Sequence, residues 1–401
     1  MLDYSYTYAI VGGGLTGASA AAGIREIDKN GTVVILGEES HLAYDRPSLT
    51  KKLWFGKKKV EDIFLYDQSF YERNGIKVEL GARVTNIDIS RKVLIDDKKN
   101  TCRFQKLLLA TGGAPRTLTI PGGDLPGICY FRYLDDYLKL RKEAMEGKTA
   151  LVIGGGFIGS EISAALTINK VKVTMLFPES YICFRVFPTE FGLSIQKRFV
   201  DKGVKIFKNE KPVSISRRGN RFVTSTETSG QIESDMVLVG IGIVPSVELG
   251  AMANVITGNG IEVNEYLQTS NPDIYAAGDN ALFPYQALGK MMRIEHWDNA
   301  INQGKQAGRN MAGAHEQYTY MPYFFSDLFE FGYEAVGNAS SELDTFADWQ
   351  KENDTGVIYY LSDGRVQGAM MCNVWNKVET AREMIRGKEK ITADALRGAI
   401  R

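Results

Sequence analysis

The sequence predicts an α/β protein with two parallel-sheet domains, because one strand–turn–helix pattern occurs twice in the chain. Each copy has a short apolar strand, a turn with glycines spaced G-x-G-x-x-G, and a helix of small residues. The strands cover residues 8–11 and 150–153. A further observation supports the repeat, since an acid follows the next apolar strand in both copies, at Glu38 and Glu179.

The glycines of the two turns match the fingerprint of a dinucleotide-binding, Rossmann-like fold. They are Gly12, Gly14 and Gly17 in the first turn, and Gly154, Gly156 and Gly159 in the second. The first glycine of such a motif makes the tight turn, the second lets the backbone approach a pyrophosphate, and the third lets helix and strand pack closely. The helix N-terminus adds free N–H groups and about half a positive charge. We therefore expect a dinucleotide site at each turn.

The elements after each turn complete the unit. We expect helices at residues 18–27 and 160–168, and second buried strands at 33–36 and 171–176. Glu38 and Glu179 lie 21 and 20 residues beyond the last glycine of their motifs, which is the position that binds ribose hydroxyls. Two dinucleotide sites in one chain favour a permanently bound flavin dinucleotide, FAD, and an exchangeable nicotinamide dinucleotide.

The composition is that of a globular protein with balanced charge. The chain has 401 residues, of which 44% are hydrophobic, with 48 basic and 48 acidic side chains. A net charge of zero argues against a nucleic-acid-binding protein. No run approaches the ~18 apolar residues of a membrane span. Because no signal peptide precedes the first strand, we expect a cytoplasmic location.

The four cysteines and three histidines are scattered along the chain, without a C-x-x-C pair or a metal-ligand spacing. We therefore expect reduced, buried thiols and no metal site.

Three further motifs carry a family resemblance. They are residues 107–116 (LLLATGGAPR), which include Thr111 and Gly112, residues 240–245 (GIGIVP) and residues 274–279 (IYAAGD). With the glycine turns, they make the chain resemble, over essentially its whole length, the flavoprotein reductases of the glutathione-reductase-like fold. The resemblance implies that Thr111 and Gly112 pass beside the flavin and that Asp279 holds its ribityl chain.

Residues 44–51 (YDRPSLTK) indicate the subgroup. The disulfide reductases of this fold have a C-x4-C pair here, whereas the first cysteine of this chain is Cys102. A dithiol relay is therefore excluded, and the pattern is similar to the ferredoxin-reductase and apoptosis-inducing factor groups. Matches at residues 51–55, 176–179, 294–296, 326–327, 332–334 and 356–361 favour the second group. The chain departs from that group in having no N-terminal targeting region and no long polar insertion near residue 350.

The resemblance implies roles for individual side chains. Lys51 and Glu161 should meet beside the flavin N5, where a cation stabilises negative charge on the reduced ring and the carboxylate fixes the ammonium. Phe157 should shield the flavin until nicotinamide displaces it, and Arg46 should reach the flavin pyrophosphate. The alternatives are an exposed lysine, a helix-surface glutamate, a core phenylalanine and a surface ion pair.

Coenzyme choice is expected to depend on Glu179. A carboxylate at this position binds the adenosine 2′-hydroxyl and repels a 2′-phosphate, so that NADH is favoured over NADPH. Arg185, six residues further on, could offset this preference. Glu295 and His296 look like the nicotinamide-side residues of the family, although a buried histidine with only a packing role is the alternative.

These observations give three expected domains: a discontinuous FAD-binding domain at about 1–118 and 248–317, an NAD(H)-binding domain at 119–247, and a C-terminal α+β interface domain at 318–401. Residues 217–220 mark a turn of a β-meander. In the last domain we expect strands at 356–361 and 365–373 and a helix at 377–386. The aromatic-rich segment 318–333 is interpreted either as the acceptor side of the flavin or as ordinary sheet packing.

The predicted function is that of an FAD-dependent NAD(P)H oxidoreductase without a redox-active disulfide. It would take hydride from NADH, with NADPH less favoured, and pass electrons to a ferredoxin, a rubredoxin, a quinone or a small molecule. The alternative is an NADH-sensing redox or assembly protein with slow turnover, similar to apoptosis-inducing factor. A monomer and a homodimer are both open.

Overall fold

The computed structural model describes residues 3–387 and 389–401, which form two compact units. Unit 1 comprises Met1–Asp45, Val60–Ala114 and Val244–Pro322, and unit 2 comprises Arg46–Lys59, Pro115–Ile243 and Tyr323–Arg401. Unit 1 thus contains the first glycine motif, and unit 2 contains the second motif together with the C-terminal segment. The finer division into three domains stays a prediction.

The core of unit 1 is a seven-stranded sheet. Its strands are β1 (Asp3–Val11), β2 (Val33–Gly37), β3 (Ile76–Leu80), β4 (Val84–Asp88), β5 (Val93–Asp96), β6 (Thr101–Leu109) and β19 (Ile274–Ala276). The order is β3-β2-β1-β6-β5-β4, and β19 pairs with β6. β1 runs parallel to β2 and β6, whereas β4 and β5 run antiparallel. The predicted first βαβ unit is therefore confirmed.

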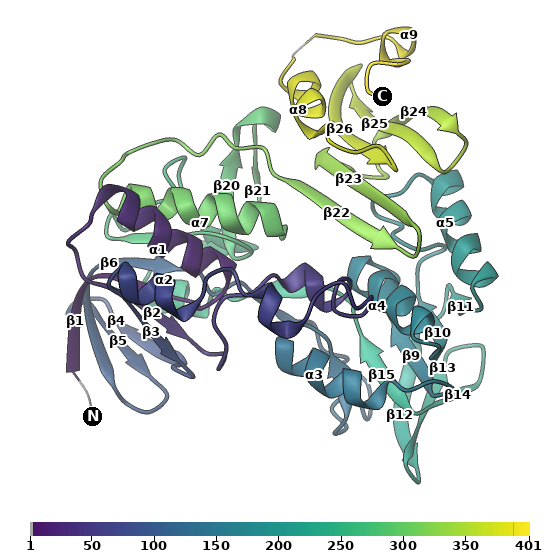
Figure 1. Ribbon diagram of the computed structural model, residues 1–401, viewed down its shortest axis with the longest axis horizontal. Coiled ribbons are helices and arrows are strands. Elements are labelled where there is room, and N and C mark those ends of the chain that lie inside the picture. The colour runs from purple at the N-terminus through teal and green to yellow at the C-terminus, as the bar shows by residue number, and fades with distance from the viewer. Residues whose placement is uncertain (1–2, 388) are drawn as a thin grey trace. The chain divides into compact units, whose positions relative to one another are not determined.

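Glycines bring two helices of unit 1 into close contact. The helices of this unit are α1 (Leu15–Ile27), α2 (Gln68–Arg73), α6 (Glu248–Met252) and α7 (Trp297–Met311). Figure 1 shows α1 and α7 side by side. A Cβ on Gly304 would lie 2.3 Å from the Thr16 carbonyl oxygen, and one on Gly308 would lie 2.0 Å from that of Ala20. The small residues of α1 therefore allow close packing on α7.

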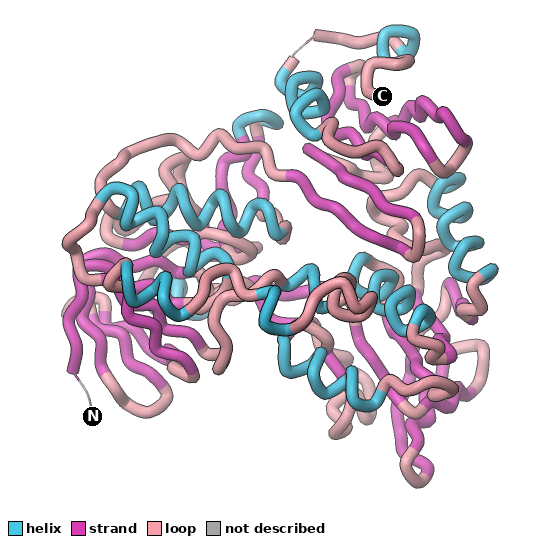
Figure 2. The backbone as a smooth tube through the Cα atoms, in the orientation of Figure 1, coloured by secondary structure: helices cyan, strands magenta, loops and turns pink. Residues whose placement is uncertain are grey.

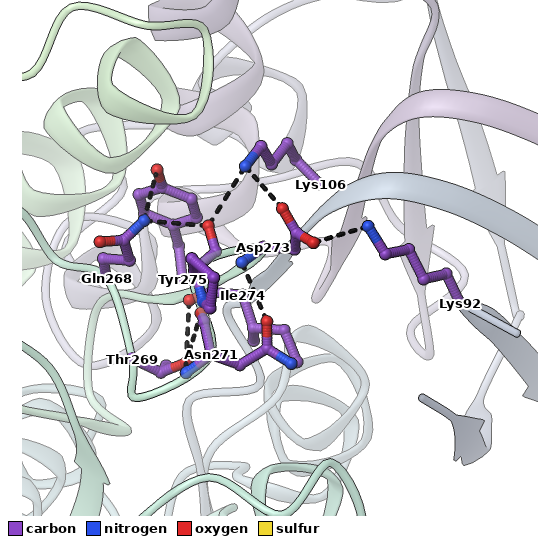
Figure 3. A network of polar contacts seen from close by, with 9 residues as sticks. Lys92, Lys106, Gln268, Thr269, Asn271, Asp273, Ile274 and Tyr275 are labelled. Carbon is purple, nitrogen blue, oxygen red and sulfur yellow. Dashed lines mark hydrogen bonds and ion pairs between the residues drawn. The ribbon is translucent and has the colours of Figure 1, made fainter. Parts of the chain in front are cut away.

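An ion-pair network fixes the approach to β19 (Figure 3). The Asp273 carboxylate receives Lys92 Nζ at 2.6 Å and Lys106 Nζ at 2.7 Å. These contacts lower the pKa of Asp273, chiefly through the Lys106 hydrogen bond. These ion pairs therefore fix the start of β19, which pairs with β6 in the sheet.

The smaller elements of unit 1 are η2 (Val60–Ile63), β17 (Thr257–Gly258), β18 (Gly260–Glu262), β20 (Ala281–Tyr285), η3 (Gln286–Leu288) and β21 (Lys290–Met292).

The dinucleotide part of unit 2 repeats this plan. It contains β8 (Ile128–Tyr130), α3 (Leu134–Glu143), β9 (Thr149–Ile153), α4 (Phe157–Ile168), β10 (Lys172–Phe177), α5 (Thr189–Asp201), β11 (Lys205–Lys208) and β15 (Met236–Val239). The sheet order is β11-β10-β9-β15-β8, and all pairs are parallel. Strands of such a sheet are buried on both faces, which explains the continuous apolar runs in the sequence.

The antiparallel parts of unit 2 were predicted in part, as a meander, strands at 356–361 and 365–373 and a helix at 377–386. A meander is formed by β12 (Pro212–Arg218), β13 (Arg221–Thr226) and β14 (Gln231–Ser234). The C-terminal segment has β22 (Tyr323–Leu328), β23 (Phe331–Gly337), β24 (Asp344–Lys351), β25 (Thr355–Ser362), β26 (Arg365–Cys372), α8 (Val378–Arg386) and α9 (Ala393–Leu396). This sheet has the order β22-β23-β26-β25-β24, and Figure 2 shows its strands in magenta. The remaining elements are η1 (Arg46–Leu49), β7 (Gly113–Pro115) and β16 (Ile243–Pro245).

The two motif helices begin earlier than predicted. α1 starts at Leu15 rather than residue 18, and α4 starts at Phe157 rather than residue 160. The reason is that Gly14 and Gly156 serve as the N-cap residues, so the helix includes the last three residues of each motif. No helix among the described residues is both long and apolar enough to cross a membrane.

Candidate active site

The first glycine turn has the geometry of a phosphate cradle. Gly12 has φ +124°, and a Cβ there would lie 2.1 Å from the Ala110 carbonyl oxygen. A Cβ on Gly17 would lie 2.0 Å from the Gly12 carbonyl oxygen. Gly14 differs, because a Cβ on it would meet no atom within 4 Å. Gly12 and Gly17 are thus required by the fold itself, whereas Gly14 leaves space above the turn.

The second turn has nearly the same geometry. Gly154 has φ +119°, and a Cβ there would lie 2.3 Å from the Gly240 carbonyl oxygen. A Cβ on Gly159 would lie 2.0 Å from the Gly154 carbonyl oxygen, while Gly156 again faces open space. The roles of the three glycines in the packing therefore agree between the two motifs.

Both turns fit the pyrophosphate of a dinucleotide. The N-caps of α1 and α4 are glycines, and neither helix has a side-chain cap bond at its N-terminus. The first N–H groups of a helix have no partner within the helix, and the helix dipole favours an anion there. The residues present therefore fit a dinucleotide at each turn, and the assignment of FAD to the first turn and of NAD(H) to the second stays a prediction.

The ATG turn and the turn after β19 are joined by hydrogen bonds within unit 1. Thr111 Oγ1 donates to the Ser246 carbonyl oxygen at 2.6 Å, and the Gly112 carbonyl accepts from Ser246 N. Asn280 Nδ2 donates to Thr111 Oγ1 at 2.9 Å. Asn280 is fully buried, and its Oδ1 has no hydrogen-bond partner among the described residues. Such a group fits a bound polar molecule, and the sequence prediction had missed it.

Asp279, Glu295 and His296 also lie in unit 1. Arg293 Nη1 donates to the Asp279 carbonyl oxygen at 3.0 Å and pairs with Glu295 at 2.5 Å. His296 is the N-cap residue of α7. Burial lowers the pKa of His296 to about 4, against the opposing effect of Asp279. Its imidazole is therefore neutral at pH 7, while its role toward the coenzyme stays a prediction.

The structure brings Lys51 and Glu161 together. Lys51 Nζ lies 2.6 Å from Glu161 Oε2, and the two side chains are 4% and 6% exposed. An exposed lysine and a helix-surface glutamate are therefore excluded. A buried pair of this kind is tolerated because each charge compensates the other. The ammonium is thus fixed beside α4, the helix whose N-terminus forms the second cradle.

Three consecutive residues of β22 contact the predicted catalytic side chains. The Phe324 and Phe157 ring centroids are 5.4 Å apart, the Phe325 ring centroid lies 5.5 Å from Lys51 Nζ, and Ser326 Oγ donates to Glu161 Oε1 at 2.6 Å. Phe157 is only partly buried, so it does not have the position of a core phenylalanine. The aromatic segment thus contacts this site within unit 2.

Thr50 adds a further hydrogen bond to the ion pair. Its Oγ1 lies 2.6 Å from Glu161 Oε2. Thr50 was indicated by the sequence, since the subgroup pattern requires a hydroxyl residue just before the lysine. Ser326 was indicated only by a family match without a role.

Arg46 and Glu38 have other partners in the structure. Arg46 Nη1 donates to the Arg132 carbonyl oxygen at 2.9 Å, and its guanidinium carbon lies 5.4 Å from the Tyr133 ring centroid. Glu38 is exposed and lies 3.5 Å from Arg83. These contacts are compatible with the predicted cofactor roles, which stay predictions.

Glu179 follows β10, as a ribose-binding acid should. Its carbonyl oxygen accepts a hydrogen bond from Asn209 N at 3.1 Å, which fixes the backbone at this point. Arg185 is exposed, and its carbonyl oxygen accepts from Ser341 N. Glu179 is partly buried, and the roles of both side chains toward the coenzyme stay predictions.

The four cysteines form no disulfide bond in the structure. They are Cys102, Cys129, Cys183 and Cys372. Burial raises the pKa of Cys129 and of Cys183 to about 12, so these thiols are poor nucleophiles at neutral pH. The described residues contain no group of His, Cys, Asp and Glu that could hold a metal ion.

Comparisons with known proteins agree with this geometry. Residues 6–304 match the model of the pyridine nucleotide-disulphide oxidoreductases, and residues 307–355 match that of the C-terminal region of the mitochondrion-associated apoptosis-inducing factor. Mitochondrial apoptosis-inducing factor 1 from Dictyostelium discoideum is 31% identical, over 96% of this chain and 79% of its own length.

Two electron-transfer reductases are also similar. Rubredoxin–NAD(+) reductase from Pseudomonas putida is 34% identical, over 80% of this chain and 83% of its own. A putidaredoxin reductase, solved in covalent complex with putidaredoxin, matches with a TM-score of 0.91 and 27% identity, over 98% of this chain and 95% of that one. This chain therefore belongs to the pyridine nucleotide-disulphide oxidoreductase family, as an FAD- and NAD(P)H-dependent oxidoreductase.

Proposed function

We propose that this chain is an NADH-dependent reductase that delivers electrons one at a time to a small iron–sulfur protein or a rubredoxin. The buried Lys51–Glu161 pair is the observation that carries the proposal. Glu161 lies one helical turn beyond Phe157, on the helix that begins at the second cradle. A fixed ammonium at this place is suited to a reaction in which negative charge arrives on a flavin.

Different residues of the chain have different roles in the proposed reaction. When bound, FAD accepts a hydride from NADH and releases electrons singly. Gly14 and Gly156 let the two pyrophosphates approach the helix N-termini. Lys51 supplies positive charge beside the redox centre. Glu161 holds the Lys51 ammonium in position and balances its charge. Phe157, held by Phe324, covers the redox centre until nicotinamide replaces it.

The acceptor class is proposed from the relatives. The Pseudomonas relative is named for rubredoxin, and the solved reductase was captured with putidaredoxin. The solved reductase covers 98% of this chain, so that similarity includes β22 and the C-terminal sheet as well as the two cradles. A quinone or another small oxidant is the competing acceptor.

An acceptor panel at fixed NADH tests this proposal. It would compare a [2Fe–2S] ferredoxin, a rubredoxin, a soluble quinone and ferricyanide. We expect a protein acceptor to give the highest kcat/KM. A panel in which the quinone alone is reduced efficiently would contradict the proposed acceptor class.

A second candidate function is an NADH-responsive assembly protein with slow turnover. The match of residues 307–355 to the C-terminal model of apoptosis-inducing factor favours it. Reoxidation of the NADH-reduced protein in air separates the two functions. Completion within seconds supports the reductase, whereas a reduced state that persists for many minutes supports the assembly protein.

The proposal includes a cytoplasmic location, NADH rather than NADPH, and no nucleic-acid partner. Four cysteines that form no disulfide bond agree with a reducing compartment. The zero net charge gives no general attraction to nucleic acid. Sedimentation would decide between a monomer and a homodimer.

A further inference from the structure

The Glu161 carboxylate is held by donors from segments far apart in the chain. Oε2 receives Lys51 Nζ and Thr50 Oγ1, each at 2.6 Å. Oε1 receives Ser326 Oγ at 2.6 Å. Ser326 is 2% exposed and Glu161 5% exposed. The carboxylate on α4 is therefore held within unit 2 by side chains that include a hydroxyl from the C-terminal sheet.

The spacing of the two elements explains this contact. Phe157 and Glu161 are four residues apart on α4, a rise of about 6 Å. Phe324 and Ser326 are two residues apart on β22, a rise of about 6.6 Å, and their side chains share one face of the strand. β22 and α4 lie against each other (Figure 1), so the two pairs match.

The two hydroxyls are not equivalent. Thr50 Oγ1 also lies 3.2 Å from the Pro47 carbonyl oxygen, and its one proton can serve only one acceptor at a time. Ser326 donates to Glu161 Oε1, which has no other donor among the described residues, although the Ser326 hydroxyl also interacts with the Tyr333 hydroxyl. Loss of the Ser326 hydroxyl would leave one oxygen of a buried carboxylate without a hydrogen bond.

We propose that Ser326 is a positioning residue for hydride transfer, which acts by holding the Glu161 carboxylate in the orientation that keeps the Lys51 ammonium in place. This inference rests on the proposed function of the Lys51–Glu161 pair. A hydrogen bond to an ionised group is roughly twice as strong as one between neutral groups. Without it, the carboxylate would be free to rotate, and the rotation would release Lys51 from its position.

The proposal gives β22 two connected tasks. Phe324 contacts the aromatic side chain at the second cradle, and Ser326 holds the acid one turn further along the same helix. Displacement of Phe157 by the coenzyme and the positions of the Lys51 and Glu161 charges would therefore be linked through one strand.

The test uses the FAD-loaded protein with Ser326→Ala, the conservative Ser326→Thr, and a matched control. Ser163→Ala is the control, because this fully buried hydroxyl lies on the same helix and has no hydrogen-bond partner among the described residues. Two readouts are the rate of flavin reduction by NADH and the flavin midpoint potential across a pH series.

We expect Ser326→Ala to slow flavin reduction about tenfold, the size of one lost hydrogen bond to a charged group. Its flavin midpoint potential should also fall, because the Lys51 ammonium is no longer held in place. Ser326→Thr should restore most of the rate, and Ser163→Ala should behave as the wild type. A Ser326→Ala protein equal to the Ser163→Ala control in both readouts would overturn the proposal.

A double-mutant cycle with Glu161→Gln separates positioning from general loss of structure. If Ser326 acts through Glu161, Ser326→Ala should cause little further change in the Glu161→Gln background. Full additivity of the two substitutions in the midpoint potential would count against the inference. If instead Glu161→Gln and Lys51→Met leave the potential and the reduction rate unchanged, the proposed function of the pair itself fails. Thermal unfolding of the same variants checks that each protein is folded.

Discussion

The two glycine turns have almost the same backbone but different surroundings. The first glycine has φ +124° in one and +119° in the other, and the third glycine is equally close to the first in both. Leu15, after the open glycine of the first turn, is buried, whereas Phe157 at the equivalent place is partly exposed and touches Phe324. We infer from the comparison that both turns suit a dinucleotide, while the neighbouring residues determine whether that dinucleotide stays bound or exchanges.

The helices that follow the two glycine turns also differ in their surroundings. α1 is locked against α7 by Gly304 and Gly308, whose backbones nearly touch it. α4 instead contains a buried acid, Glu161, paired with Lys51. We infer that unit 1 is built for permanent binding and that unit 2 is built for a reaction with an exchanging coenzyme.

We expect the clearest difference between the two turns from substitution of Gly14 and Gly156, the glycines that face open space. A Cβ on Gly14 or Gly156 meets no protein atom within 4 Å, so Ala at either position leaves the fold intact and affects only the approach of a phosphate. We expect Gly14→Ala to yield protein that has lost most of its FAD. Gly156→Ala should retain FAD but lose roughly 100-fold in NADH affinity, or about 2.7 kcal/mol.

FAD content by absorbance and NADH affinity by stopped-flow titration would measure these effects. Unchanged circular dichroism serves as the control for folding. If both variants lost FAD to the same extent, the assignment of different dinucleotides to the two cradles would be wrong.

The ion pair gives the next largest effect, and only in unit 2. Lys51→Met or Glu161→Gln leaves the other partner buried without its opposite charge, which typically costs about 3–5 kcal/mol. The double variant should be less destabilised than the sum of the single variants. Lys51→Met should also lower the flavin midpoint potential, because reduced flavin loses a nearby cation.

Chemical denaturation and dye equilibration would give the two quantities. Strict additivity of the two substitutions would show that the pair does not act as one unit.

Physical reasons explain which residues of the site could be predicted from the sequence and which could not. Gly12 and Gly154 were predictable because a positive φ next to a neighbouring carbonyl admits little except glycine. The Lys51–Glu161 pair came from a family pattern, since a local sequence does not show which distant charges meet. Ser326 and Asn280 were missed because their roles depend on packing between segments more than 100 residues apart.

A pH effect on stability should arise in unit 1, in contrast to the ion-pair effect of unit 2. All three histidines lie in unit 1, and His296 has a pKa lowered to about 4 by burial. The unfolded chain binds a proton at His296 near pH 6.5, which the folded chain does not bind until about pH 4. Stability should therefore fall as the pH drops from 6.5 toward 4, by about 1–3 kcal/mol.

Thermal unfolding across this pH range, compared between the wild type and His296→Gln, would measure the contribution. His315→Gln, at an exposed histidine, is the matched control. A His296→Gln protein with the wild-type pH slope would exclude this histidine as the cause.

Coenzyme choice should give the smallest change, and it concerns the second cradle alone. We expect NADH to reduce the flavin faster than NADPH by about tenfold, or about 1.4 kcal/mol, because the Glu179 carboxylate repels a 2′-phosphate. Glu179→Gln should narrow this ratio, whereas Glu38→Gln in the first cradle should leave it unchanged. A wild-type preference for NADPH would show that Arg185 outweighs Glu179.

The most direct test of the account is an anaerobic titration of the purified protein with NADH, followed by visible absorbance. The account predicts a yellow protein that retains FAD through gel filtration and loses its flavin absorbance on addition of an equal amount of NADH. A colourless protein that takes up no FAD, or a retained flavin that NADH does not bleach, would contradict the division of tasks between the two cradles.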